Sequence, residues 1–144
     1  MTKVGYQSRV AYRVPYADTD QMGFVYYANY LVYFERARNE LMREIDIPYR
    51  DLEERGIGLP VITAHLDYKA PAVYDDELEL VSSLGWLRGV RMQVNCQVCR
   101  HGQILVSGYT VHAVMNMKTH RAVRLPDDLS AKFALALMEE GRLA

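Results

Sequence analysis

Apolar and polar residues follow two different periods along this chain. From about Asn29 the apolar residues recur every three or four positions, which predicts an amphipathic helix over residues 29–45. We expect Asn29 to cap the first turn of this helix. Pro48 either ends the helix or begins a short second one that runs to residue 57. The apolar face of the long helix consists of Tyr30, Phe34, Ala37, Leu41 and Ile45.

Most other segments alternate between apolar and polar positions, as β-strands do. A first strand is expected over residues 5–14, followed by a loop at 15–28 that contains Pro15 and Gly23. Residues 101–102 have the composition of a tight hairpin turn. The remaining expected elements are a long or bent strand at 59–74, strands at 76–87, 90–100 and 103–117, and a short helix at 127–141.

This order of one strand, a long helix and about four antiparallel strands predicts an α+β fold. A helix over 29–45 is about 25 Å long at 1.5 Å per residue, and five strands about 4.8 Å apart span about 19 Å. One helix can therefore lie in the concavity of one curled sheet. Because a single helix leaves strand edges and part of the sheet uncovered, we expect pairing with another chain.

The composition is that of one globular domain spanning residues 1–144, with 50% hydrophobic and 24% charged residues. The net charge of −1 gives no electrostatic reason to expect a nucleic-acid partner. No segment has the length of a transmembrane helix, and the chain does not open on a charged and then apolar signal sequence. We therefore expect a cytoplasmic protein without membrane insertion.

Cys96 and Cys99 form a CxxC spacing, which raises the question of a redox or zinc site. The pair lies in an alternating strand pattern, where residues three apart point to opposite faces. The chain has no second CxxC and no pair of histidines at ligand spacing. We expect two free thiols, no metal site and no cofactor.

Two motifs carry the chemistry of the chain. The first, "DTDQMGFVYYANYLVYFERAR" at 18–38, places Asp18 and Asp20 shortly before the helix. The second is "YKAPAVYDDELEL" at 68–80. Both resemble the motifs of hotdog-fold acyl-CoA thioesterases, in the branch of 4-hydroxybenzoyl-CoA thioesterase and the Tol-Pal-associated thioesterases. The resemblance spans nearly the whole chain and implies a five-stranded antiparallel sheet wrapped around a long central helix.

The resemblance implies that Asp20 is the catalytic carboxylate, either as nucleophile or as general base. The residue chemistry agrees, because a thioester needs little general-acid help and a helix N-terminus can stabilise the developing oxyanion. We expect the backbone N–H of Tyr27 or Ala28 to donate to that oxyanion, with Gly23 allowing the sharp approach. Asp18 is expected to brace the loop.

Further residues of the first motif are candidates for substrate binding. Glu35 either faces the acyl pocket or is a solvated helix residue beside Arg38, and the aromatic residues either line a pocket or belong to the core or an interface. Family members related to the Tol-Pal system often have histidine where this chain has Tyr27, which puts a histidine-assisted mechanism in doubt. The substrate-binding candidates are Gly23, Tyr26, Tyr27, Ala28 and Glu35.

The expected function is hydrolysis of an acyl-CoA to a free acid and coenzyme A. The resemblance implies a homo-oligomer, either a dimer or a dimer of dimers (a homotetramer), with active sites at the dimer interface. A non-catalytic module that binds an acyl thioester or an acyl carrier protein is the alternative. A thioester dehydratase is disfavoured because its catalytic histidine motif is missing. The acyl chain, aliphatic or aromatic, and the carrier, coenzyme A or a carrier protein, are left open by the sequence.

Overall fold

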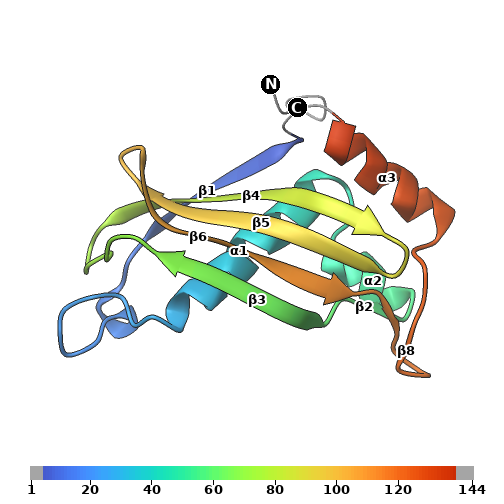
Figure 1. Ribbon diagram of the computed structural model, residues 1–144, viewed down its shortest axis with the longest axis horizontal. Helices are drawn as coiled ribbons and strands as arrows, with labels where there is room; N and C mark the ends of the chain where they lie inside the picture. The colour runs from blue at the N-terminus through green and yellow to red at the C-terminus, as the bar shows by residue number, and fades with distance from the viewer. Residues whose placement is uncertain (1–4, 139–144) are drawn as a thin grey trace.

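The computed structural model describes residues 5–138, which form a five-stranded antiparallel sheet curved around one long helix (Figure 1). The strand order is β1-β4-β5-β6-β3, so β1 and β3 are the edges of this sheet. This confirms the expected α+β fold. The strands of the sheet are β1 (Gln7–Arg13), β3 (Val61–Tyr68), β4 (Glu77–Arg88), β5 (Arg91–Arg100) and β6 (Gln103–Ala113).

The smaller elements lie around the ends of the sheet. Three two-residue strands form a second sheet in the order β2-β7-β8. The helix α3 lies at the end of the sheet near the β4–β5 turn (Figure 1). These elements are the 3₁₀ helix η1 (Tyr16–Asp18), α1 (Asn29–Glu44), α2 (Tyr49–Glu54), β2 (Ile57–Gly58), β7 (Met115–Asn116), β8 (Arg121–Ala122) and α3 (Asp127–Met138).

The core lies between α1 and the concave face of the sheet. The apolar face of α1 is buried as expected, with Phe34 and Leu41 at 1% and 0% exposure. Burial of each such side chain stabilises the fold by about 1.5–3 kcal/mol. The hydroxyl of Ser82 on β4 donates to the carbonyl oxygen of Ala37 at 3.0 Å, which ties the helix to the sheet. The helix is thereby held in one position relative to the strands.

One predicted cap and three predicted boundaries were wrong. The short second helix expected to run to residue 57 ends at Glu54, and residues 57–58 form β2. Asn29 is the first helical residue and not the cap; its side chain instead donates to the carbonyl oxygen of Asp18 at 2.9 Å. The strand expected over 59–74 ends at Tyr68, because Pro71 has no N–H to continue a ladder. The strand expected over 103–117 breaks at Val114, whose N–H donates to Val90. The final helix is confirmed as far as residue 138, and residues 139–141 lie outside the described part.

Cys96 and Cys99 are both buried and free. Burial raises the pKa of Cys96 to about 12, so its thiol stays protonated at neutral pH. Within residues 5–138 no group of three or more His, Cys, Asp and Glu side chains is placed to hold a metal ion. None of the helices in the same range has the length and apolar character needed to span a bilayer.

His112 on β6 is a buried histidine that should make stability pH-dependent. Its Nδ1 lies 2.8 Å from the carbonyl oxygen of Leu59 and its Nε2 lies 2.8 Å from the hydroxyl of Thr110. Burial lowers the pKa of His112, and the charge of Arg38 lowers it further. A histidine that is kept neutral by burial stabilises the fold fully above its unfolded pKa of about 6.5. This part of the free energy of unfolding is lost as pH falls from there through the folded pKa.

We therefore expect the free energy of unfolding of the wild type to decrease between pH 7.5 and pH 5. In His112→Gln this decrease should be smaller, on top of a uniform loss of about 1–3 kcal/mol from the disrupted hydrogen bonds. Urea unfolding at both pH values measures the two effects. The same decrease with pH in both proteins would show that His112 does not titrate in this window.

Candidate active site

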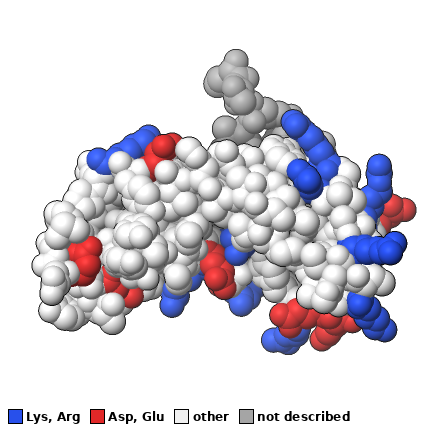
Figure 2. Space-filling model, turned by 60° about the horizontal axis from the view of Figure 1, so that its bottom comes forward, with Lys and Arg blue, Asp and Glu red and all other residues white. Residues whose placement is uncertain are grey.

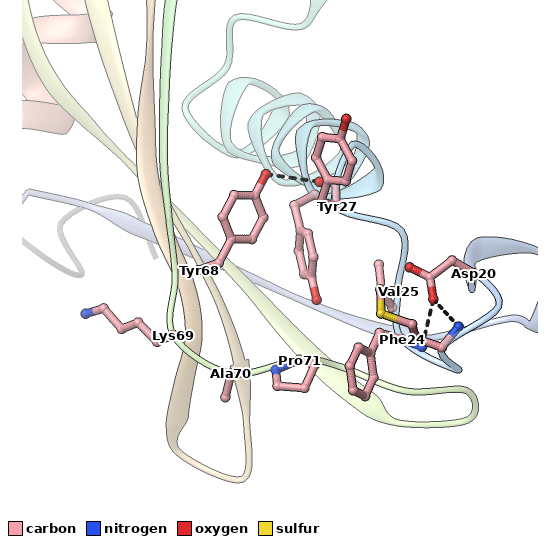
Figure 3. Close-up of a pocket in the computed structure, with 10 residues that line it drawn as sticks. Asp20, Phe24, Val25, Tyr27, Tyr68, Lys69, Ala70 and Pro71 are labelled. Atoms are coloured by element: carbon pink, nitrogen blue, oxygen red, sulfur yellow. Dashed lines mark hydrogen bonds between the residues drawn. The ribbon is translucent and has the colours of Figure 1, made fainter.

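Asp20 lies in the loop between β1 and α1, where its own side chain shapes the turn. Its Oδ1 accepts the backbone N–H groups of Met22 at 2.9 Å and Phe24 at 3.3 Å (Figure 3). Gly23 has φ of +82°, a left-handed conformation that glycine adopts without steric cost. Within residues 5–138 the second oxygen, Oδ2, accepts no hydrogen bond. One carboxylate oxygen is thus fixed and the other is available for chemistry.

The N-terminus of α1 offers unpaired hydrogen-bond donors next to this loop. The N–H of Tyr26 donates to Asp18 and that of Asn29 donates to Tyr26, both at 2.8 Å. In the described part of the chain, the N–H groups of Tyr27 and Ala28 donate to no other residue. Free N–H groups at a helix start combine with the helix dipole to favour negative charge. This is the donor arrangement that a developing oxyanion requires.

Asp18 stabilises the loop that carries Asp20, as the sequence suggested. Its Oδ2 accepts the hydroxyl of Tyr12 on β1 at 2.8 Å and that of Tyr33 on α1 at 2.7 Å. Burial, followed by the hydrogen bond to Asp18, raises the pKa of Tyr33. Both phenols therefore remain donors at neutral pH. The carboxylate of Asp18 joins the first strand, the long helix and the loop that carries Asp20.

A hollow of about 340 Å³ opens beside Asp20. Its wall is largely apolar and aromatic, and the ring of Tyr30 forms an edge-to-face contact with that of Tyr68, with centroids 5.6 Å apart. Figure 3 shows Asp20 and Tyr68 on different sides of this hollow. An acyl group of moderate size would fit here. The hollow is lined by Asp20, Met22, Phe24, Val25, Tyr27, Tyr30, Tyr68, Lys69, Ala70 and Pro71.

The second motif holds one wall of the hollow in place. The carboxylate of Asp76 accepts the N–H of Val73 at 2.9 Å and forms an ion pair with Arg100 at 2.7 Å. The N–H of Val25 donates to the carbonyl oxygen of Ala72 at 2.8 Å, which joins this segment to the Asp20 loop. A backbone hydrogen bond therefore connects the two sequence motifs in the folded chain.

Comparison with known proteins agrees with this geometry. Residues 14–133 match the family model of the thioesterase-like superfamily, which covers most of the chain. The chain belongs to this superfamily. Its fold is therefore the hotdog fold, as the motifs implied.

Two curated relatives and one solved structure show this similarity in detail. The acyl-CoA thioesterase YbgC of Haemophilus influenzae is 31% identical over 84% of this chain and 90% of its own length. The Bacillus subtilis protein YneP is 42% identical over 48% of this chain, a match that covers half of YneP. The hypothetical protein TT1821 of Thermus thermophilus is 32% identical, with a TM-score of 0.86 over 92% of this chain and 99% of that one.

In this thioesterase-family chain, Gly23, Tyr27 and Ala28 lie at the loop and helix start beside Asp20. Of the five substrate-binding candidates only Tyr27 lines the hollow itself. The ring of Tyr26 contacts that of Tyr27, with centroids 4.8 Å apart. Glu35 is exposed and lies further along α1, where it faces a different groove. In the described part of the chain it forms no ion pair with Arg38. The structure therefore separates Glu35 from the other four candidates.

Several residues of the site escaped the sequence analysis, and two of them make specific contacts there. Tyr68 ends β3 and lines the hollow, and Arg100 ends β5 and pairs with Asp76. Tyr68 opens the second motif, "YKAPAVYDD", but nothing in its spacing shows that it meets the helix start. Arg100 lies in neither motif, so only the antiparallel register of the sheet brings it to Asp76.

Proposed function

We propose that this protein is an acyl-CoA thioesterase in which Asp20 performs the hydrolysis and the N-terminus of α1 stabilises the oxyanion. The observation that carries the proposal is that Asp20 and Tyr27 line the same hollow, while within residues 5–138 the Oδ2 of Asp20 and the N–H groups of Tyr27 and Ala28 have no hydrogen-bond partner. Membership of the thioesterase-like superfamily supports the same reaction. Water and an acyl-CoA yield a free acid and coenzyme A.

The carbonyl carbon of the thioester is attacked either by Oδ2 of Asp20 or by a water molecule that Asp20 deprotonates. Direct attack forms a mixed anhydride and expels the thiolate, and water then cleaves the anhydride. In both routes negative charge builds on the carbonyl oxygen, where one oxyanion donor is worth about 10²–10³ in kcat. The leaving thiolate needs no acid, since an ordinary thiol titrates near pH ~8.5.

The reaction is tested by thiol release from a panel of short, medium, long and aromatic acyl-CoAs. We expect release from at least one class, which then identifies the acyl group. The same acyl group on a phosphopantetheine carrier protein measures the preference between carriers. Absence of release from every substrate would reject hydrolysis, and binding of acyl-CoA without turnover would support the non-catalytic module.

We also propose that the active form is at least a homodimer that pairs across β3. Figure 2 views the molecule from the side on which β3 lies in Figure 1, and the middle of this surface has few charged side chains. β3 ends the strand order, so its outer backbone groups are unpaired in the described chain. The exposed apolar residues of β3 and the adjacent face of α1 include Leu31, Val32, Val61, Ile62 and Tyr68.

The groove between α1 and β3 gives this pairing a functional consequence. Val32, Glu35 and Val61 line it together, apart from the hollow that contains Asp20. A substrate-binding role for Glu35 therefore requires a second copy of the chain across the groove. A self-complementary contact of this kind is the commonest arrangement among homo-oligomers.

A further inference from the structure

The hydroxyl of Tyr68 links β3 to the start of the central helix. It donates to the carbonyl oxygen of Tyr27 at 3.2 Å, across 41 positions of sequence. Figure 3 shows the phenol reaching from the strand toward the helix start, with Asp20 on the other side of the hollow. Burial raises the pKa of Tyr68, so the phenol is a donor throughout the neutral range.

The carbonyl that accepts the hydroxyl of Tyr68 belongs to the same peptide group as an N–H that has no partner among the described residues. The carbonyl of Tyr27 and the N–H of Ala28 share one planar peptide unit, and in a trans peptide they point in opposite directions. The same carbonyl also accepts the N–H of Tyr30 at 3.4 Å, in the first turn of α1. The hydroxyl of Tyr68 adds a shorter bond from the β3 side, and together the two bonds fix the direction of the Ala28 N–H. A hydrogen bond accepted by the carbonyl also polarises the peptide, which strengthens its N–H as a donor.

Core stability does not explain this bond. Tyr68 is 52% exposed, and a hydrogen bond between partly solvated groups contributes little to folding. The ring of Tyr68 is nevertheless held in place by its edge-to-face contact with Tyr30, whose own hydroxyl accepts the N–H of Ala72 at 3.2 Å. The ring of Tyr68 thus packs against the buried Tyr30, and its hydroxyl donates to the carbonyl oxygen of Tyr27 at the candidate oxyanion site.

We propose that Tyr68 is a positioning residue for thioester hydrolysis, which orients and polarises the Tyr27–Ala28 peptide so that the Ala28 N–H serves as an oxyanion donor. This inference rests on the proposed thioesterase function. Tyr68 should therefore affect the transition state and not the binding of substrate, because negative charge on the substrate's carbonyl oxygen develops only in the transition state. The wall that its ring contributes to the hollow is a separate role in substrate binding.

Tyr68→Phe separates these two roles, since it removes the hydroxyl and keeps the ring. We expect kcat to fall about tenfold with KM changed less than about twofold. Tyr68→Leu should also raise KM, because it removes the aromatic wall. The matched control is Tyr109→Phe on the outer face of the sheet, where the ring stacks on His65; kcat and KM should stay as in the wild type.

A second readout is independent of turnover. In ¹H–¹⁵N spectra of the whole protein, Tyr68→Phe should shift the amide resonance of Ala28, and Tyr109→Phe should not. An unchanged kcat, or a rise in KM without a shift of the Ala28 resonance, overturns the positioning role. A wild type that hydrolyses no acyl-CoA overturns the proposed function and this inference with it, whereas an active wild type matched by Tyr68→Phe overturns this inference alone.

Discussion

Asp20→Asn is expected to lower kcat about 10³-fold, within the range of about 10²–10⁴ that a general base or comparable group contributes. Asparagine keeps an oxygen that can accept the N–H groups of Met22 and Phe24, so the turn should survive. The amide has no negative charge with which to attack the thioester or take a proton from water. Stopped-flow or steady-state thiol release with the best acyl-CoA of the panel measures the loss.

The matched control is Asp51→Asn, on α2 and outside the lining of the hollow. It should leave kcat unchanged, and circular dichroism should show all three proteins equally folded. Full turnover by a folded Asp20→Asn would reject the mechanism. Mass spectrometry of the wild type after single turnover in H₂¹⁸O tests for the anhydride route, because ¹⁸O in Asp20 arises only when water attacks the Asp20 carbonyl carbon of the anhydride.

The fold was predictable because its largest elements carry strong local patterns. The helical period from Asn29 and the alternation of the later strands depend on which side chains face the core, and the core lies where the pattern placed it. The boundaries were less predictable. The end of β3 at Tyr68 depends on Pro71 and on two backbone N–H groups that both donate to the carbonyl oxygen of Leu105. This contact joins segments that are distant in sequence.

The candidate site was predictable where its parts are close in sequence. Asp20, Gly23 and the helix start lie within one motif, and the structure brings them together. Glu35 could not be placed, because its orientation depends on the rotation of α1 against the sheet. Tyr68 and Arg100 could not be found, because each reaches its partner only through the register of the folded strands.

Val32→Lys is expected to dissociate the proposed dimer and to lower kcat/KM about 10²-fold at nanomolar protein. Val32 is 50% exposed in the single chain and lines the groove beside β3. In a two-fold dimer the substitution occurs twice, and each lysine loses hydration in a groove whose lining already contains one carboxylate and one guanidinium, those of Glu35 and Arg38. Lysine is at least as good a helix former as valine, so α1 itself should not be weakened.

Light scattering coupled to gel filtration measures the mass, and thiol release at matched concentrations measures the activity. The control Met138→Lys replaces a residue that is also about half exposed, 47%, but lies on α3 away from β3. It should remain an active dimer, or a tetramer if two dimers associate. A fully active wild-type monomer would show that one chain completes the site, and a substrate-binding role for Glu35 would then have no structural support. Loss of activity together with dissociation would instead place the groove of α1 and β3 within the catalytic unit.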